Sequence, residues 1–330
     1  MEKTARRLTT DQLPVILFAL LFLAVLVTFQ ILQPQFLSAD NLINMAQSVS
    51  TTVIAAIGLT FVIAIGRSDI SFYMTCCFCG VLMAWLVSVG WHPVPAILAG
   101  AGAGAVWGTV SGFAVGRMKL PDIITTIAIG SIAFGLGYVF SDGAFIMTNF
   151  IESKTHYLSQ YTVLGIPLPV YVMAVVMLLS YYLLERSKFG RSFYAIGSTE
   201  KAAYLSGVNV NRTIILAYVI CGTLAAIAAL IMTARQGYGN VKIGMNILMP
   251  CFTAVYIGMS VFKRPCVIGT FLGALLVIAI STGFTSINIP YYWSNLVTGF
   301  VLIFAILLSK AVVREKAVRP VQAQEGGRGK

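Results

Sequence analysis

Side chains that could carry out catalysis or bind a metal are few in this chain of 330 residues. Three of its six cysteines lie in the run 76–79, which lacks the spacing of a metal site and has no histidine beside it, so buried thiols are expected. His92 and His156 are isolated in predicted loops. No phosphate-binding, zinc-protease or serine-hydrolase motif occurs in the sequence. The sequence therefore predicts no catalytic residue, no metal site and no ATP hydrolysis by this chain.

The longest charged stretch, residues 185–212, separates two apolar runs. Ser198 is suited to cap a helix, Glu200 to its first turn and Gly207 to its end, which predicts about two helical turns over residues 199–206. A helix so short is marginal in water unless it packs against another surface. The stretch is therefore expected to bind a partner protein, and an ordinary surface helix is the alternative.

Polar side chains within the apolar runs could hydrogen-bond a passing neutral solute, or they could hold neighbouring helices together. Arg67 and Asp69 interrupt the second run and could pair with each other, either in an interfacial loop or at a break that lines a cavity. Asp122, after Pro121, is expected to complement the N-terminus of a helix. The sequence has no chain of buried carboxylates typical of ion-coupled carriers. The candidate solute-pathway residues are Asn44, Gln47, Asp69, Ser71, Thr125, Thr126 and Ser131.

The elements that must position these residues are long apolar runs. Hydrophobic residues make up 58% of the chain and charged residues 10%, as in a membrane protein with many spans. The runs are continuously apolar rather than alternating, which excludes a β-barrel and predicts an all-α polytopic membrane protein. About ten runs are long enough to cross a bilayer, namely residues 13–32, 42–66, 72–89, 94–115, 123–140, 166–184, 213–233, 248–262, 266–285 and 293–309.

Glycines recur at every fourth residue of the fourth run, which places them on one slowly winding face of a helix. Such a face lets another backbone approach closely, so tight helix packing is the expected role. A sliding surface in a protein that changes shape is the alternative. Gly102 is expected to add to this face, whose periodic members are Gly100, Gly104, Gly108, Gly112 and Gly116.

The formal net charge of +11 follows from an uneven distribution of charge between loops. An even number of spans with both termini in the cytoplasm places 19 of the 22 Lys and Arg residues inside, and only Lys154, Arg235 and Lys242 outside. Nucleic-acid binding is then an unnecessary explanation of the charge. We expect a cytoplasmic tail over residues 1–12, a transmembrane domain over 13–309 with the cytoplasmic loop 185–212, and a basic, disordered cytoplasmic tail over 310–330.

Within the charged stretch, residues 189–197 read FGRSFYAIG and residues 201–210 read KAAYLSGVNV. Together they resemble the pattern F-G-R-x-x-Y-A-I-G-G-N-x-x-A-A-x-L-S-G-I-x-V of the ribose-type sugar permeases of ABC importers. Residues 119–126 and 269–275 are similar to further motifs of the same family. The resemblance runs from about the first span to the last.

This resemblance implies a transport subunit rather than an enzyme. Its short helix would seat in a separate cytoplasmic ABC ATPase that binds ATP and Mg, so this chain would need no cofactor of its own. The other implied partners are a second permease copy or a paralogue, an extracytoplasmic solute-binding protein and membrane lipid, in the bacterial inner membrane. The residues that the resemblance assigns to ATPase coupling are Gly190, Arg191, Glu200, Lys201, Ala202, Ala203, Tyr204, Leu205 and Gly207.

Three segments depart from the family pattern, and one of them has Phe134-Gly135 in place of the usual Arg-Gly of the fifth span. In the other two, residues 66–73 read GRSDISFY where the family has G-G-x-D-L-S-x-G, and residues 257–265 lack most glycines of a second family motif. A basic, stiffer turn is expected in place of that second motif. Such losses are expected in a half that works beside a more typical paralogue, and a homodimer is the alternative.

The solute is expected to be a sugar or a sugar-like molecule. Residues 244–250 and 253–255 resemble the autoinducer-2 branch of the family. An ABC permease for branched-chain amino acids or nucleosides is one alternative, and an ion-coupled secondary carrier is another.

Overall fold

The computed structural model describes residues 2–150, 152–290, 293, 296–303 and 306, with side chains described from residue 14 onward. The described chain is almost entirely helical, and its single small sheet pairs β1 (Thr162–Val163) with β2 (Ile166–Pro167) in antiparallel fashion. Within these residues, nine helical segments are long and apolar enough to cross a membrane. The predicted all-α polytopic fold is confirmed.

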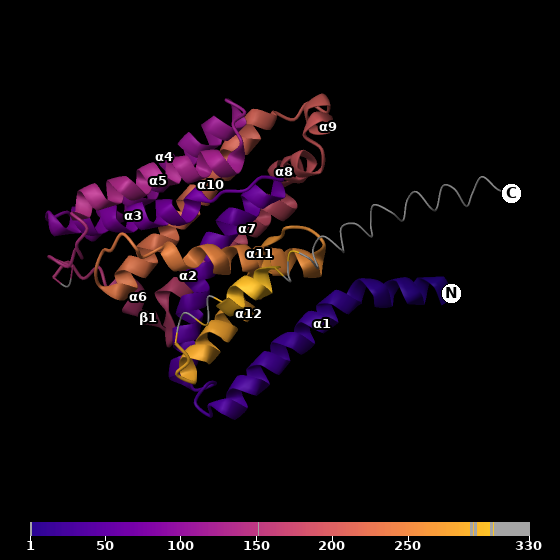
Figure 1. Cartoon of the computed structure of the whole chain (residues 1–330), viewed down its shortest axis with the longest axis horizontal. Coiled ribbons are helices and arrows are strands. Elements are labelled where there is room, and N and C mark those ends of the chain that lie inside the picture. Colours follow the sequence, from indigo (N-terminus) through magenta and orange to yellow (C-terminus); the bar gives the residue numbers. More distant parts are fainter. Residues whose placement is uncertain (1, 151, 291–292, 294–295, 304–305, 307–330) are drawn as a thin grey trace.

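The candidate spans alternate in direction through the bundle (Figure 1). They are formed by α1 (Glu2–Leu32), α2 (Ala39–Ala64), α3 (Ser71–Ser88), α4 (Pro93–Gly116), α5 (Asp122–Ser141), α7 (Leu168–Tyr181) with the π-helical turn Tyr182–Arg186, α10 (Val210–Gln236), the short 3-10 turn Met245–Ile247 with α11 (Leu248–Phe262), and α12 (Val267–Ser286). Each corresponds to one of the first nine predicted runs.

Two predicted segments fall at least partly outside the described residues. The tenth predicted span, 293–309, includes 294–295, 304–305 and 307–309, which are not described, whereas 296–303 are helical. The predicted C-terminal tail, 310–330, lies wholly outside the described residues. At the other end of the chain, the predicted N-terminal tail is helical from Glu2 onward and continuous with the first span.

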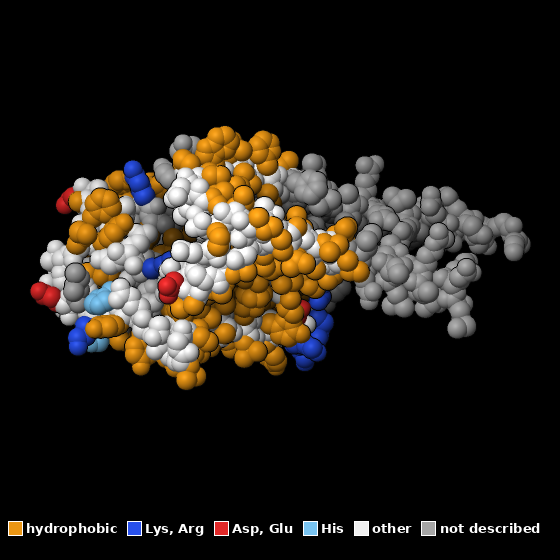
Figure 2. Space-filling view, turned by 90° about the horizontal axis from the view of Figure 1, so that it is seen from below, with side chains coloured by type: hydrophobic (Ala, Val, Ile, Leu, Met, Phe, Trp, Pro, Cys, Tyr) orange, Lys and Arg blue, Asp and Glu red, His pale blue; other side chains and the backbone are white. Residues whose placement is uncertain are grey.

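Helices α2 and α10 form the centre of the bundle. α10 packs against α2, α3 and α4, and α2 also contacts α7, α11 and α12. In the most apolar 18-residue stretch of α2, 83% of the residues are buried, compared with only 6% in that of α1. α1 therefore lies at the periphery, beside α11 and α12 (Figure 1). Figure 2 shows a broad apolar surface across the middle of one face. Apolar surface of this kind is stable in lipid rather than in water.

Glycines bring the backbones of neighbouring helices into contact at several places, among them α4 with α10 and α11 with α12. A methyl group at Gly104 or Gly108 of α4 would overlap the backbone carbonyl of Gly222 or Tyr218 in α10. Gly100, Gly112 and Gly116 also face α10, so the whole periodic set lies at this interface. The expectation for Gly102 is wrong, because no atom lies within 4 Å of the position where its Cβ would be, and two residues along a helix turn a side chain to the other side. α11 and α12 pack in the same way at Gly258 and Gly273.

The charged stretch between the sixth and seventh spans folds into two short helices, α8 (Lys188–Ser198) and α9 (Glu200–Leu205). The predicted short helix over 199–206 is confirmed as α9, but the prediction that Ser198 caps it is wrong, because Ser198 ends α8, which was not predicted, and the extended backbone of Thr199 separates the two helices. Ser187 caps α8 by accepting a hydrogen bond from the Gly190 amide at 3.2 Å. Buried apolar residues of α8 pack on the end of α2, where Phe193 meets Phe61 edge-on.

Candidate functional site

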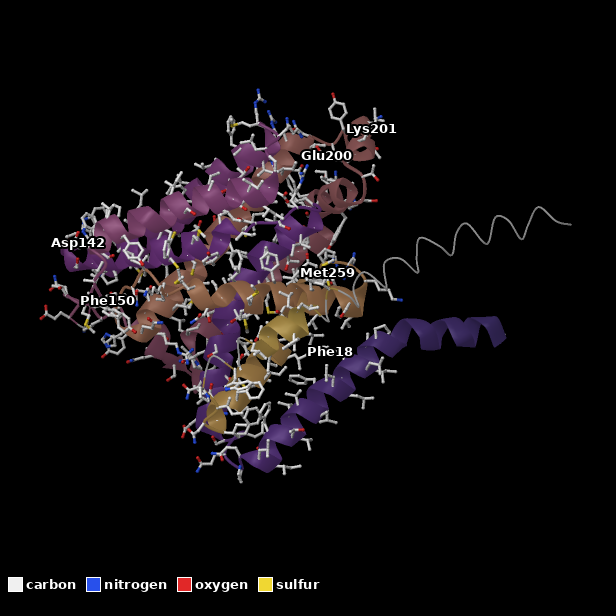
Figure 3. All side chains as sticks on the ribbon, viewed as in Figure 1. Phe18, Asp142, Phe150, Glu200, Lys201 and Met259 are labelled. Atoms are coloured by element: carbon white, nitrogen blue, oxygen red, sulfur yellow. The ribbon has the colours of Figure 1, made fainter. Side chains whose placement is uncertain are left out.

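Glu200 joins three parts of the fold at the end of the bundle that carries α9. Its Oε2 accepts a hydrogen bond from Arg67 Nη2 at 2.8 Å, and its Oε1 accepts one from Lys119 Nζ at 2.9 Å. Arg67 lies in the break between α2 and α3, and Lys119 lies in the connection between α4 and α5. The hydrogen bond from Lys119, together with the positive charges of Lys119 and Arg67, holds the pKa of the Glu200 carboxyl below its usual value against the effect of burial. Figure 3 shows Glu200 and Lys201 at the opposite end of the molecule from Asp142 and Phe150.

The break between α2 and α3, residues 65–70, is held in place from two neighbouring helices. Asp122, in the first turn of α5 as predicted, accepts a hydrogen bond from the Ser68 amide at 2.8 Å. Thr126 Oγ1 accepts one from the Ile70 amide at 3.2 Å. From α10, the Tyr218 hydroxyl donates to the Ser68 carbonyl at 2.9 Å. The irregular backbone is therefore satisfied within the protein, as a break at membrane depth requires.

The expected pairing of Arg67 with Asp69 is wrong. Asp69 is 1% exposed and accepts hydrogen bonds from the Ser71 amide at 2.8 Å and from the Ser71 hydroxyl. Arg67 points instead to Glu200, which is 133 positions later in the sequence. Because α3 begins at Ser71, the Asp69 carboxylate serves the first turn of that helix, whose free amides attract a negative charge.

Residues 257–265, where the chain departs from the family pattern, also contact the segment between the sixth and seventh spans. Arg264 Nη2 lies 3.5 Å from Glu185 Oε2, and its guanidinium lies over the Tyr194 ring, 5.4 Å from the centroid. The Tyr194 hydroxyl donates to the Pro265 carbonyl at 2.7 Å. Both unusual basic positions, Arg67 and Arg264, thus hold the α8–α9 segment against the bundle. Neither contact was predicted, because each joins residues far apart in the sequence.

The residues expected to couple to an ATPase divide into a buried and an exposed group. Gly190 and Ala203 are buried, and a methyl group at Gly190 would overlap the Leu184 carbonyl. Tyr204 and Leu205 are 71% and 76% exposed. Arg191, Lys201, Ala202 and Gly207 are also exposed, whereas Glu200 is partly covered by its two cations.

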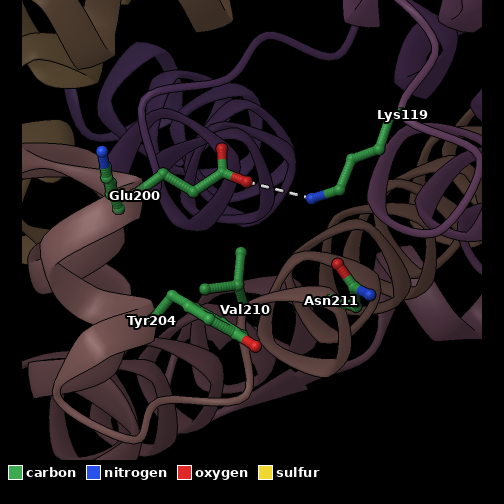
Figure 4. Close-up of a pocket in the computed structure, with 6 residues that line it drawn as sticks. Lys119, Glu200, Tyr204, Val210 and Asn211 are labelled. Carbon is green, nitrogen blue, oxygen red and sulfur yellow. Dashed lines mark hydrogen bonds and ion pairs between the residues drawn. The ribbon is translucent and has the colours of Figure 1, made fainter.

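The exposed face of α9 therefore presents an aromatic and an aliphatic side chain to a partner. Phe189 of α8, 60% exposed, adds a third apolar group that sequence reasoning left out of the set. The position of Phe189 directly before Gly190 in the FGRSFYAIG motif could have identified it as part of the set. Figure 4 shows Tyr204 beside a pocket of about 490 Å³ that is crossed by the Glu200–Lys119 ion pair.

The candidate solute-pathway residues do not form a single site. Asp69, Ser71, Thr125 and Thr126 are buried around the break between α2 and α3. Asn44 and Gln47 lie near the other end of α2, where Gln47 Nε2 donates to the Ser159 carbonyl at 3.1 Å. Ser131 is exposed on α5 and its hydroxyl donates to the Ile127 carbonyl of its own helix. Within this chain alone, the side chains of Gln47, Asp69 and Thr126 hydrogen-bond to neighbouring segments, whereas that of Ser131 bonds only within α5.

Comparisons with known proteins match nearly the whole chain. The ribose import permease protein RbsC of Haemophilus influenzae is 30% identical over 296 residues, which cover 88% of this chain and 90% of that protein. RbsC of Bacillus subtilis is 31% identical over 292 residues, covering 88% of this chain and 90% of that protein. The L-arabinose ABC transporter permease protein AraH of Azospirillum brasilense is 26% identical over 293 residues, covering 88% and 86%. No solved structure matches.

A family described as the permease component of the branched-chain amino acid transport system matches residues 41–306. This range includes eight of the nine described spans, the break between α2 and α3, and the α8–α9 segment. The chain therefore belongs to this family of transport-system permease components.

Proposed function

We propose that this chain is the membrane-spanning permease subunit of an ATP-driven importer for a sugar or a sugar-like neutral solute in the bacterial inner membrane. The observation that carries the proposal is the likeness, along 88% of the chain, to permease proteins whose names specify ribose and L-arabinose. The spans provide the route through the bilayer, and hydrolysis of ATP takes place on another subunit.

The distribution of charge supports a neutral solute. In the nine described spans, charged residues lie only at the ends: Asp40, Asp122, Glu185, Arg186, Arg212 and Arg235. An amino acid carries an ammonium and a carboxylate, and both need charged or strongly polar partners away from water. A sugar needs only hydrogen bonds from hydroxyl, amide and backbone groups, which the polar residues of the spans provide.

The exposed face of α9 is the proposed contact with the ATPase. Six residues make a helix that is too short to be stable alone, so its position depends on Glu200 and on the buried Ala203. Movement of α9 would pull on the break between α2 and α3 through Arg67 and on the α4–α5 connection through Lys119. The excess of Lys and Arg at this end supports a cytoplasmic location for α8 and α9, with both termini on the same side.

Other subunits complete the proposed importer. A solute-binding protein would deliver the solute from outside, and a second permease would complete the pathway. The departures from the family pattern support a paralogue as that second permease. Candidate pathway residues on different parts of this chain would then face a shared axis.

Uptake by the purified complex in proteoliposomes tests this function. We expect ATP-dependent accumulation of a labelled pentose that a proton ionophore does not abolish. Unlabelled pentoses, autoinducer-2, branched-chain amino acids and nucleosides, added in turn as competitors, would identify the solute class. Uptake that persists without the ATPase and collapses with the ionophore would show an ion-coupled carrier instead. Competition by leucine but not by any pentose would contradict the sugar assignment.

A further inference from the structure

A basic pocket lies between the C-terminal end of α4, the end of α9 and the N-terminal end of α10. It has a volume of about 600 Å³ and contains two arginines but no acidic residue among its lining residues. The lining residues are Arg117, Tyr204, Gly207, Val208, Asn209, Val210, Asn211, Arg212 and Ile215. It adjoins the pocket in Figure 4, with which it shares Tyr204, Val210 and Asn211.

The charges in the two adjoining pockets differ. The pocket of Figure 4 contains an acidic residue, Glu200, which pairs with Lys119 and with Arg67, beside a second lysine, Lys201. In contrast, no described residue forms an ion pair with Arg117 or Arg212, and both side chains are exposed. The basic pocket therefore has two uncompensated positive charges, with the Tyr204 hydroxyl and the Asn211 amide nearby as hydrogen-bonding groups.

The backbone of α10 adds to this positive potential. α10 is 27 residues long and begins at Val210. Asn209 Oδ1 accepts a hydrogen bond from the Arg212 amide at 3.2 Å. The amides of Val210 and Asn211 have no acceptor among the described residues. Free amides at the start of a long helix favour an anion, and here they supplement the two guanidinium groups.

The position of the pocket relative to lipid indicates which anion fits. Arg117 directly follows the span of α4, and Arg212 lies in the first turn of the span of α10, so both are at the boundary of the hydrocarbon. Val106, Val110 and Phe113 are 61%, 43% and 47% exposed, and they share one face of α4 with Arg117 because of their spacing. An acyl chain lying along this apolar face would bring its headgroup to the pocket.

We propose that the basic pocket binds the headgroup phosphate of an anionic phospholipid, whose acyl chains lie along α4. Basic pockets between membrane helices on the cytoplasmic side suit anionic headgroups, and the cytoplasmic leaflet is the one rich in them. The lipid would contact Tyr204 from the side of the bundle, so the composition of the membrane would influence the position of α9.

Lipid binding to the purified full-length chain tests the proposal. The variant is Arg117→Gln with Arg212→Gln, and the matched control is Arg186→Gln with Lys188→Gln, which removes the same charge at the same end of the bundle outside the pocket. Native mass spectrometry and thermal unfolding would be measured with phosphatidylglycerol, with phosphatidylcholine and with inorganic phosphate. We expect phosphatidylglycerol to remain bound and to raise Tm, with an affinity about thirtyfold lower in the pocket variant and unchanged in the control.

Each other outcome would overturn the proposal. Equal binding of phosphatidylglycerol by the pocket variant and the control would show that the two arginines do not form the site. A full Tm increase with inorganic phosphate alone would identify a soluble anion as the ligand. If phosphatidylglycerol has no effect but the pocket variant loses its co-eluting ATPase, the arginines contact an acidic protein surface. The lipid measurements are compared only among proteins whose Tm without lipid matches that of the unmodified chain, which establishes that the variants are folded.

Discussion

Neutralising Glu200 should loosen α9 by a predictable amount. The Arg67 and Glu200 side chains are 28% and 39% exposed, and the Lys119 side chain is 50% exposed, so both pairs are screened by water. Ion pairs in such positions contribute about 0.2–1 kcal/mol each. We place the less exposed Arg67 pair at about 1 kcal/mol and the Lys119 pair at about 0.5 kcal/mol. Glu200→Gln should thus lower the free energy of local opening of α9 by about 1 kcal/mol, since a neutral amide retains part of the hydrogen bonding.

Hydrogen exchange of the α9 amides measures this quantity directly. The informative amides are those of Ala203, Ser206 and Val208, which donate to carbonyls within the α9 segment. A change of 1 kcal/mol corresponds to about fivefold faster exchange. A double-mutant cycle with Arg67→Gln and Glu200→Gln isolates the pair energy from other effects of each substitution. α12, which lies apart from α9, provides the internal reference.

The reasoning would be refuted by a small coupling energy. If the single variants and the double variant give additive changes within about 0.2 kcal/mol, Arg67 and Glu200 do not stabilise each other in solution. Faster exchange throughout α12 as well as α9 would indicate general destabilisation rather than a local effect. In either case the proposed mechanical link from α9 to the break between α2 and α3 would lose its support.

Three further predictions concern packing, partner binding and pH. Gly108→Ala should lower the free energy of unfolding by about 1–3 kcal/mol, because its methyl group overlaps the Tyr218 carbonyl, whereas Gly102→Ala should be nearly neutral; thermal unfolding in detergent checks both. Replacing both Tyr204 and Leu205 by alanine should reduce ATPase co-elution severalfold without changing Tm, since both side chains are exposed, and unchanged co-elution would place the contact elsewhere. The Glu200 pKa is lowered in the folded protein, so the stabilisation from its pairs is present above the ordinary carboxyl pKa and is lost as pH falls through the lowered value. Hydrogen exchange of the α9 amides, corrected for intrinsic rates, should therefore be constant from neutral pH to about pH 5 and accelerate only below it.

The spans could be predicted because their signal is local. Each apolar run determines its own helix by length and composition, whatever its neighbours are. α8 was not predicted, although its buried residues Phe193 and Ile196 have the i, i+3 spacing of one helix face; that face becomes part of the core because α2 lies beneath it. Its N-cap, Ser187, was a usable local signal. The glycine face of α4 was visible in the sequence, but its partner helix was not.

Partner choice at the candidate site was not predictable from the sequence. Proximity along the chain suggested that Arg67 pairs with Asp69, but Asp69 is buried at the start of α3 and its carboxylate accepts hydrogen bonds from Ser71. Glu200 becomes the partner because the fold brings α9 beside the break, and this depends on contacts across the whole bundle. The motif places Tyr204 and Leu205 together on α9, where both are exposed, and their contact with an ATPase stays a prediction; the burial of Gly190 and Ala203 needed the packed structure.

The glycine contacts have a consequence for how the bundle can move. Where backbone touches backbone, as at Gly108 with Tyr218 and at Gly273 with Ala254, there is no layer of side chains to repack. The pairs α4–α10 and α11–α12 are therefore expected to move as two rigid units. α2 contacts both units, and Thr60 Oγ1 of α2 lies 2.7 Å from Thr270 Oγ1 of α12. Gly58 also brings α2 against the backbone of Cys221 in α10, so we expect shear between α2 and α12, where side chains such as Thr60 and Thr270 form the contact.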